Sequence, residues 1–409
     1  MNSVFVNADR QMQRNLEFWG QYQEDHMDEI FGNHLYELSK SRVLKKRFFS
    51  LTEKFLVKNK LGRQKMVPIE WKIVDPFIEE NKSEVRYGFR LGHTGNYKDF
   101  YVFDINSLEK WIEKLSKVCI MTDIEDDYDF IKPIGKGRSA KIFLAERVGD
   151  MKKFAIKSIK KSYLLENSEF VDLLINEIKN MRKCNHPNIA KLHRVYESET
   201  HVHLVIDYAE GGDLFNRILQ KKKFDDEAIL RLSYKFMEVL EYLDSINIVH
   251  RDIKLENILM VSEGNDYDFK LADFGLSEEA SGDLHKKCGS PGYIAPEILQ
   301  GLPYGTKVDV FSFGIVLYIL LTGKMPFNGK TSQDILCKNK DCKLNFQEII
   351  WNYVPHNCLS FLVRLVQKDQ NCRSTARDML DHPWLSETSS KMEKIKTSPI
   401  IKSEEKREE

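Results

Sequence analysis

The chain has 409 residues, which exceeds the length of one typical domain and indicates two domains with a tail. Its 62 basic and 62 acidic residues give a formal net charge of zero, so the global charge gives no indication of a nucleic-acid partner. Seven cysteines without a CxxC pair favour reduced thiols over zinc or disulfides, and no apolar run approaches the ~18 residues of a membrane span, so we expect a soluble, cytoplasmic protein without a transmembrane segment.

Residues 1–30 are polar and are expected to form a disordered or helical lead-in, with Phe18 and Trp19 as its only strong anchors. From 31 to 120, short runs rich in β-branched and aromatic residues alternate with turn-like clusters, which predicts a meander of antiparallel strands. Ser107 is a plausible N-cap for a following amphipathic run around Trp111, which predicts a helix at the end of a small, bent β-barrel. The strands are expected at 34–38, 47–51, 54–57, 69–74, 87–91 and 100–103.

This pattern of strands closed by a helix with a central tryptophan resembles the pleckstrin homology domain. In phosphoinositide-binding members, basic residues on the first two strands and their loop form a cup for inositol phosphates, which here implies Lys40, Lys45 and Arg47. Lys45 and Arg47 occupy alternate positions of a strand and would face the same side. The partner would be a phosphoinositide membrane surface, with peripheral recruitment. The alternative is a solvated basic hairpin on a domain that binds protein or nothing.

Two polar segments flank the larger region at 128–385. Residues 121–127 form a short acidic connector without Gly or Pro, and a linker of this length leaves little reach, so the two domains are expected to touch. Residues 386–409 form a charged tail that is expected to be disordered. The tail lacks the bulky apolar anchors of an amphipathic calmodulin target, so calmodulin is not predicted as a partner.

The stretch from His250 to Asn257 is predicted to be a polar loop between two apolar runs. It contains Asp252, Lys254 and Asn257, and Asp273 follows in a nearby turn. Two carboxylates, an ammonium group and an amide suit phosphoryl transfer, in which catalysis consists mostly of positioning and charge neutralisation.

At this loop the chain resembles the eukaryotic protein kinases, whose motifs occur in family order from 128 to 385. The resemblance implies a bilobal α+β fold after the small β-barrel, with ATP and Mg²⁺ as cofactors. Asp252 would be the catalytic base or orienting group, Lys254 the cation on the transferred phosphate, and Asn257 and Asp273 the magnesium ligands. Lys254 also favours a serine/threonine kinase, because tyrosine kinases usually replace this lysine.

The resemblance also implies a nucleotide site. Two glycines, 135 and 137, would let a hairpin approach the phosphates closely, although Ala140 stands where the family has its third glycine. Lys157 would hold the α- and β-phosphates, with Glu177 as its partner. The other residues that the resemblance places around ATP are Gly135, Gly137, Ile142, Ala155, Asp207, Ala209, Asp213 and Leu259.

Asp213, Glu256 and Ser290 match family positions that contact the protein substrate. Asp213 and Glu256 correspond to positions that contact an arginine three residues before the phosphoacceptor, so basic substrates are expected. The motifs at 207–215 and 288–297 are nearest to those of the calcium/calmodulin-dependent kinases.

The resemblance to the protein kinases also implies three residues that support the site from outside it. Glu297 would be buried against Arg373, and loss of either partner would leave an unpaired buried charge. Asp309 would orient the catalytic loop.

Arg251 precedes the catalytic aspartate, and in many relatives such an arginine binds a phosphate on the activation segment, which follows Asp273 and would be closed here by residues 290–297. The position of that phosphate, two residues before Cys288, is Lys286 here, which cannot accept one. Either the segment orders unaided, or Ser281 substitutes, or control comes from elsewhere, for which an N-terminal domain that covers the kinase is the nearest candidate.

The sequence thus predicts a serine/threonine kinase that depends on ATP and Mg²⁺. Two alternatives belong to other classes: a catalytically weak kinase fold that acts as a scaffold, and a lipid-recruited adaptor. A scaffold without activity would be favoured if a central polar residue of the site were missing. None is missing, because the sequence contains all five: Lys157, Glu177, Asp252, Asn257 and Asp273.

Overall fold

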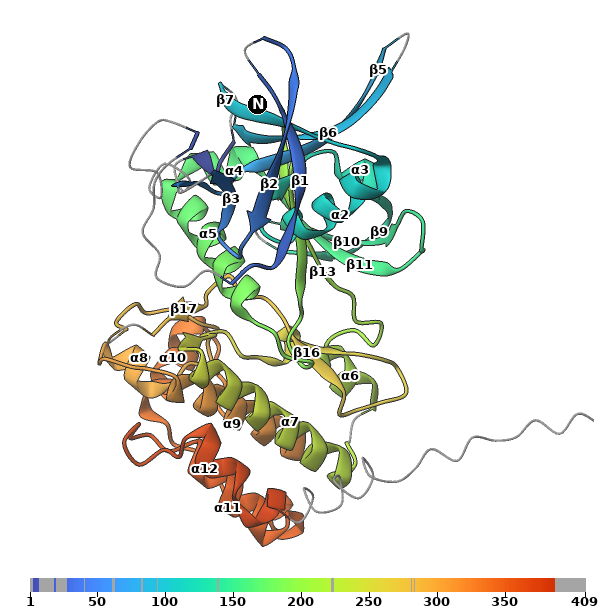
Figure 1. The fold of residues 1–409 in the computed structure, drawn as a ribbon. Helices are drawn as coiled ribbons and strands as arrows, with labels where there is room; N and C mark the ends of the chain where they lie inside the picture. The colour runs from blue at the N-terminus through green and yellow to red at the C-terminus, as the bar shows by residue number, and fades with distance from the viewer. Residues whose placement is uncertain are drawn as a thin grey trace, which may run out of the picture. The chain divides into compact units, whose positions relative to one another are not determined.

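The computed structural model describes residues 3–6, 18–19, 28–39, 41–60, 63–81, 84–93, 95–137, 140–221, 224–280, 282 and 284–386. Lys40, Ser281, most of the lead-in and the tail from 387 onward therefore lie outside the described residues. The chain divides into two compact units (Figure 1). The first unit holds residues 1–178 and 191–208, and the second holds 179–190 and 209–409.

In the part of the chain that the structure describes, the first unit is built on one sheet of 13 strands. Its helices are α2 (Ile105–Leu115), α3 (Ile124–Asp127), α4 (Lys161–Glu166) and the start of α5 (Ser168–Lys183). In the order of hydrogen bonding, the strands are β4 (Arg63–Pro68), β3 (Phe55–Lys60), β2 (Leu44–Leu51), β1 (Phe31–Leu38), β7 (Asn96–Val102), β6 (Glu84–His93), β5 (Ile73–Asn81), β8 (Ile120–Met121), β12 (Leu192–Glu197), β13 (His201–Asp207), β11 (Lys153–Lys160), β10 (Ala140–Arg147) and β9 (Tyr128–Lys136).

The N-terminal strands β1–β7 pair antiparallel, as the alternation of apolar runs and turns predicts. The prediction of a strand at 69–74 is wrong for residues 69–72, because Ile69 and Trp71 lie in the turn between β4 and β5. Both side chains are buried, so their apolar character reflects core packing from a turn. The polar strand β4 was not predicted, because its sequence has no clear apolar run.

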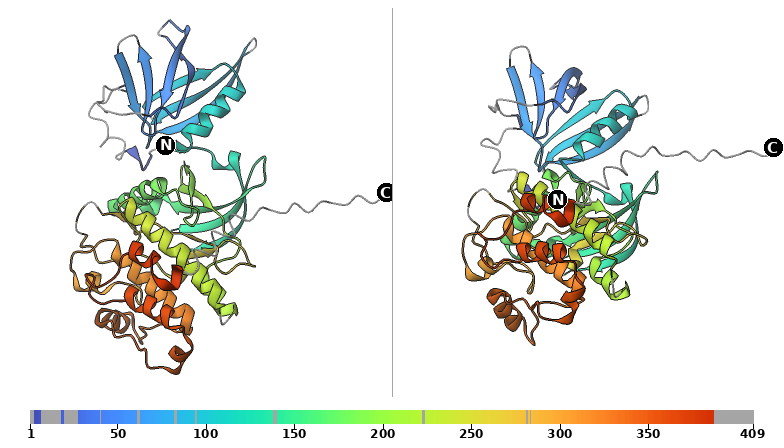
Figure 2. Two further views of the ribbon diagram at one scale, coloured as in Figure 1. Left: turned by 60° about the horizontal axis from the view of Figure 1, so that its bottom comes forward. Right: turned by 90° about the horizontal axis from the view of Figure 1, so that it is seen from below.

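Helix α2 carries its apolar residues on one face, with Leu108, Trp111 and Leu115 buried. The N-cap is Asp104, and not the predicted Ser107: the Asp104 carboxylate accepts the backbone N–H of Ser107 at 2.7 Å. The helix packs against β5, β6 and β7 (Figure 2). Among the described strands β4 and β5 share no ladder, so the predicted barrel is an open sheet.

The connector predicted at 121–127 is part of the fold and is not a free linker. Ile120 pairs in parallel with Ile73 of β5 and with Val195 of β12, so β8 lies between the N-terminal strands and β12. The side chain of Ile124, in α3, is also buried. The sequence does not predict this arrangement, because few apolar residues enter the sheet and acidic residues follow them directly.

One hydrophobic core spans the junction at which β8 joins the N-terminal strands to β12. It contains Trp111 from the N-terminal domain (residues 31–120) together with Tyr128 and Tyr196 from the following region. Phe18 and Trp19, the predicted anchors of the lead-in, pack against the same core. The two regions therefore share one core, which favours cooperative folding.

A short N-terminal segment, residues 3–6, also joins this unit. Phe5 is fully buried and stacks on Trp71 at 5.5 Å between ring centroids. The backbone N–H of Val4 donates to the buried carboxylate of Glu197 at 2.8 Å, and Lys161 Nζ lies 2.8 Å from the same carboxylate. Phe18 and Trp19 are therefore not the only anchors before residue 30.

The second unit is mainly helical. Residues 308–320 of α9 are all buried, as expected for a helix that is apolar on every side. Helices α7 and α9 pack side by side (Figure 1). Among the described residues, no helix combines the length and apolarity needed to cross a membrane. The elements are α6 (Leu214–Lys221), α7 (Asp226–Ser245), β14 (Ile248–Val249), η1 (Leu255–Asn257), β15 (Ile258–Met260), β16 (Phe269–Leu271), β17 (Glu278–Glu279), α8 (Pro296–Gln300), α9 (Lys307–Thr322), α10 (Ser332–Asp341), η2 (Ile349–Tyr353), α11 (His356–Leu365) and α12 (Ala376–Leu380).

Candidate active site

Asp309 of α9 holds the polar loop between β14 and β15 through hydrogen bonds to its backbone. The Asp309 carboxylate accepts the backbone N–H of His250 at 2.6 Å and that of Arg251 at 2.9 Å. Burial raises the pKa of Asp309, while these donors favour its charged form. Arg251 has a φ of 66°, a left-handed conformation that costs free energy in a residue with a side chain, and the contacts with Asp309 stabilise it. The predicted orienting role of Asp309 matches this geometry.

Asp252 is the centre of a compact polar cluster in the second unit. Lys254 Nζ lies 2.7 Å from Asp252 Oδ2 and donates to Ser290 Oγ at 2.9 Å. Ser290 donates in turn to Asp252 Oδ1 at 2.6 Å. Asp252 is buried, whereas Lys254 and Ser290 are partly exposed. The cluster thus places a carboxylate, an ammonium group and a hydroxyl from the catalytic and activation segments within hydrogen-bond reach.

Asn257 and Asp273 have the chemistry of magnesium ligands. Asn257 Nδ2 donates to the Asp252 carbonyl at 2.8 Å and to Asp252 Oδ2 at 3.1 Å, which leaves its amide oxygen as the group for a cation. Asp273 is exposed and has a φ of 64°. Among the described residues no group of three or more His, Cys, Asp or Glu side chains could hold a metal. A magnesium ion held by Asn257 and Asp273 would take further oxygens from phosphates and water, which is its usual preference.

The turn that presents Asp273 is fixed by its neighbours. The ring of Phe274 is buried and contacts His250 edge-on at 4.7 Å between centroids. His250 Nε2 lies 3.1 Å from the carbonyl oxygen of Ala272. The position of Asp273 is thus set from both sides by buried groups.

The first unit contains the residues expected to bind the nucleotide phosphates. Lys157 of β11 lies 2.6 Å from the Glu177 carboxylate of α5, so the predicted pair forms. Gly135 pairs with Ile142 across the β9–β10 hairpin, and the Gly137 N–H donates to the carbonyl of Ala140 at 2.9 Å. The hairpin is therefore closed on itself by backbone hydrogen bonds, and Gly135 and Gly137 place no side chain at their own two positions.

The remaining predicted nucleotide residues are distributed over both units. Ala155 lies on β11 opposite Ile206 of β13. The carboxylate of Asp207 is 2.7 Å from His193 Nε2 and accepts the Lys191 N–H at 3.2 Å, so it is engaged within the first unit. In the second unit, Ala209 is buried and Leu259 is partly exposed, and Leu259 forms a backbone bridge with Asp213.

Asp213 and Glu256, the predicted substrate-binding carboxylates, lie on contacting elements. Asp213 accepts the Asn216 N–H at 2.7 Å and thereby caps α6, which packs against η1. Glu256 is exposed on η1. Sequence reasoning did not assign a role to Asn339, a fully buried residue that accepts the Gly292 N–H at 3.1 Å and donates to the Ile294 carbonyl at 2.6 Å. An isolated asparagine in a polar helix carries no sequence signal for this role.

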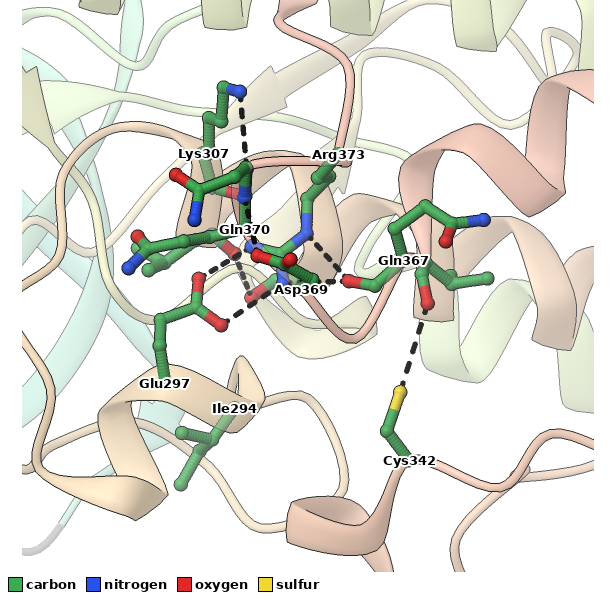
Figure 3. Close-up of polar contacts among 12 residues, drawn as sticks. Ile294, Glu297, Lys307, Cys342, Gln367, Asp369, Gln370 and Arg373 are labelled. Atoms are coloured by element: carbon green, nitrogen blue, oxygen red, sulfur yellow. Dashed lines mark hydrogen bonds and ion pairs between the residues drawn. The ribbon is translucent and has the colours of Figure 1, made fainter.

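Glu297 and Arg373 form the expected buried pair (Figure 3). Arg373 Nη1 and Nη2 donate to the two carboxylate oxygens of Glu297 at 2.6 and 3.0 Å. Arg373 also donates to the carbonyls of Gln367 and Lys307 (Figure 3). Because every arm of the guanidinium finds an acceptor, the pair anchors the end of the activation segment to the helices that follow.

The N-terminal domain contains a basic cluster near the predicted lipid site. Glu37 on β1 is nearly buried and contacts three cations: Lys98 Nζ at 2.6 Å, Arg47 Nε at 3.5 Å, and Lys58. Burial alone would raise the pKa of Glu37, but the hydrogen bonds from Lys58 and Lys98 hold the pKa below its ordinary value. Lys45 pairs with Glu37 in the β1–β2 ladder and is exposed. Three cations against one carboxylate leave an excess of positive charge on this face.

Comparison with known proteins identifies relatives for the region that follows the N-terminal domain. The protein kinase domain model matches residues 128–385. The calcium/calmodulin-dependent protein kinase type 1 of Caenorhabditis elegans is 36% identical over 265 residues, which cover 64% of this chain and 75% of that protein. Myosin light chain kinase A of Dictyostelium discoideum is 34% identical over 272 residues, covering 66% of this chain and 92% of that protein. The calcium/calmodulin-dependent protein kinase type 1B of Rattus norvegicus is 34% identical over 265 residues, covering 64% and 76%.

Proposed function

Because this chain belongs to the protein kinase family, we propose that it transfers the γ-phosphoryl group of ATP specifically to serine and threonine hydroxyls of proteins. The observation that carries the proposal is the cluster of Asp252, Lys254 and Ser290, in which the carboxylate and the ammonium group are already positioned by hydrogen bonds. All relatives named above are described as kinases, and two as calcium/calmodulin-dependent ones. Calcium control of this chain is not part of the proposal, since the tail sequence lacks the anchors of a calmodulin target.

In the proposed reaction, the acceptor oxygen attacks the γ-phosphorus while the bond to the leaving phosphate oxygen breaks. Asp252 orients the hydroxyl and accepts its proton, and Lys254 neutralises charge on the transferred group. Asn257 and Asp273 would hold Mg²⁺, which supplies charge stabilisation on the phosphates. Lys157, fixed by Glu177, would hold the α- and β-phosphates. The hydrogen bond from Ser290 keeps the carboxylate of Asp252 in one orientation before substrate arrives.

Three short peptides test both the reaction and its selectivity. The first has a serine acceptor with arginine three residues before it, the second replaces that arginine by alanine, and the third replaces the serine by tyrosine. We expect kcat/KM to be highest for the first peptide, because the carboxylates of Asp213 and Glu256 favour a guanidinium group.

The variant Glu256→Gln should lower kcat/KM about tenfold for the arginine peptide, which corresponds to about 1.4 kcal/mol, and change it little for the alanine peptide. The alanine peptide is thus the control for general damage to the enzyme. Phosphorylation of the tyrosine peptide at the rate of the serine peptide would contradict the proposed acceptor class, and equal rates for the arginine and alanine peptides would contradict the basic preference.

We propose further that the pleckstrin homology-like N-terminal domain binds an anionic phosphoinositide surface and recruits the kinase to the cytoplasmic face of a membrane. The excess positive charge around Glu37 supports this proposal, since inositol phosphates are recognised by clustered cations. Val43, near the tip of the β1–β2 hairpin, is 57% exposed and lies between exposed Arg42 and Lys45. An apolar residue flanked by cations suits the interface of an anionic leaflet.

Replacement of Lys45 and Arg47 together by alanine should weaken binding to vesicles that contain a phosphoinositide by about thirtyfold, because each of the two basic groups near the surface contributes about 1 kcal/mol. Kinase activity in solution should stay unchanged. The matched control removes the same charge elsewhere, with Lys114→Ala on α2 and Lys117→Ala in the turn that follows it, and should bind as the wild type does. Equal binding by all three proteins at near-physiological salt would eliminate the lipid proposal.

A further inference from the structure

The arginine of the catalytic loop is a buried charge that needs a counter-charge. The Arg251 side chain is 2% exposed. Its Nε donates to the Leu276 carbonyl at 2.6 Å and its Nη1 to the Tyr304 hydroxyl at 3.4 Å, which are both neutral acceptors. The carboxylate of Asp309 accepts the backbone N–H of Arg251 and is shared with His250, so its hydrogen bonds go to the backbone and not to the guanidinium. A buried guanidinium without an opposite charge is strongly destabilised, and the penalty would fall on the loop that carries Asp252.

Glu278 supplies this counter-charge from the start of the activation segment. Its carboxylate Oε2 lies 3.0 Å from Arg251 Nη2. The position is set by the backbone, because β17 pairs antiparallel with β14 and places Glu278 opposite Val249, two residues before Arg251. A fixed carboxylate therefore stands next to Arg251 without any modification of the chain.

The rest of the segment is connected to the same group. Tyr304, which accepts from Arg251, donates its hydroxyl to the Lys286 carbonyl at 2.6 Å, and its backbone forms a bridge with Leu284. The Lys286 side chain is exposed, so this position contributes its backbone and no negative charge. A few residues further on, Ser290 donates to Asp252. The described part of the segment is thus ordered from Glu278 to the catalytic cluster.

We propose that Glu278 is a positioning residue for phosphoryl transfer: by neutralising Arg251 it holds the catalytic loop and activation segment in the competent arrangement without phosphorylation of that segment. The inference rests on the proposed kinase function and adds to it the device that replaces the activating phosphate. Glu278 touches neither substrate nor nucleotide and acts through Arg251. Its effect is therefore on the fraction of enzyme that is competent, which enters kcat more than the KM for ATP.

The experiment compares full-length proteins made in bacteria together with a phosphatase, with mass spectrometry to establish that no phosphate is present. We expect the unphosphorylated wild type to be fully active. Glu278→Gln should lower kcat by about ten- to hundredfold with little change in the KM for ATP, and Glu278→Asp should recover part of the loss. The control is Glu279→Gln, since Glu279 pairs with Lys183 in a contact where both side chains are about half exposed, and its loss should leave kcat near that of the wild type.

Two outcomes overturn the proposal and leave kinase activity itself intact. One is a wild-type protein that gains activity only after its activation segment is phosphorylated, a comparison that decides the matter even if Glu278→Gln does not fold. The other is a Glu278→Gln protein with wild-type kcat. A wild type that transfers no phosphate in either form would instead contradict the proposed function, and the role of Glu278 with it.

Discussion

Asp273→Asn should abolish measurable phosphoryl transfer while leaving the fold unchanged. Asparagine has nearly the same shape, and Asp273 is exposed at a turn whose position is fixed by buried neighbours. What is lost is the negative charge that would hold Mg²⁺, and catalysis in this reaction class consists mostly of charge stabilisation. We expect kcat to fall by about a thousandfold or more, with the melting temperature within about 2 °C of the wild type.

Lys157→Met tests the same reaction from the first unit. Lys157 is positioned by Glu177 at 2.6 Å, and methionine keeps the apolar stem but removes the ammonium group. The expected loss is again about a hundred- to thousandfold in kcat/KM. Lys160→Met, an exposed lysine on the same strand, is the matched control and should behave as the wild type does. Near wild-type turnover by both cleanly purified Lys157 and Asp273 variants would show that the catalytic assignment is wrong.

The polar residues of the site were predictable because their chemistry and order along the chain are distinctive. Asp252, Lys254 and Asn257 fall in one short loop. Ser290 is distant from this loop in the sequence, but in the structure it donates a hydrogen bond to Asp252. The pairs of Lys157 with Glu177 and of Arg373 with Glu297 are also found as expected. Both pairings were predicted from the resemblance to the protein kinases, and each joins residue types that suit the reaction or a buried charge.

The residues that sequence reasoning missed act through position and not through a distinctive pattern. Glu278 could not be assigned to Arg251, because one acidic residue in an acidic dipeptide has no periodicity or motif, and the contact depends on the pairing of two short strands. β8 was overlooked for a similar reason. Two apolar residues before an acidic run do not indicate a strand in the sequence. They form β8 because they pair with β5 on one side and with β12 on the other.

The largest stability effect should follow from disruption of this junction. Ile120 is fully buried where β8 joins the N-terminal strands to β12, so Ile120→Asp places a charge without a designed partner in a buried position at this junction. Burial of such a group costs several kcal/mol, against a total stability of about 5–15 kcal/mol for a typical domain. We expect the N-terminal domain and strands β9–β13 to unfold together at a melting temperature at least about 10 °C lower, with activity lost in parallel. Ile78→Asp is the matched control, since Ile78 is 53% exposed on β5, and should melt as the wild type does.

Removal of residues 1–120 tests whether the N-terminal domain is instead a separable cover. An inhibitory cover should leave a stable, activated kinase when it is deleted, and that was one alternative that the sequence left open. The structure favours the opposite result, because the deletion takes away Ile120 and with it the parallel pairing to Val195, and uncovers Tyr128 and Tyr196. Exposure of fully buried side chains costs about 1.5–3 kcal/mol each, so the truncated chain should be insoluble or inactive, and its exposed β12 edge should promote aggregation. A soluble truncated protein with wild-type or higher kcat would show that the shared core is dispensable and that the N-terminal domain acts as a regulator.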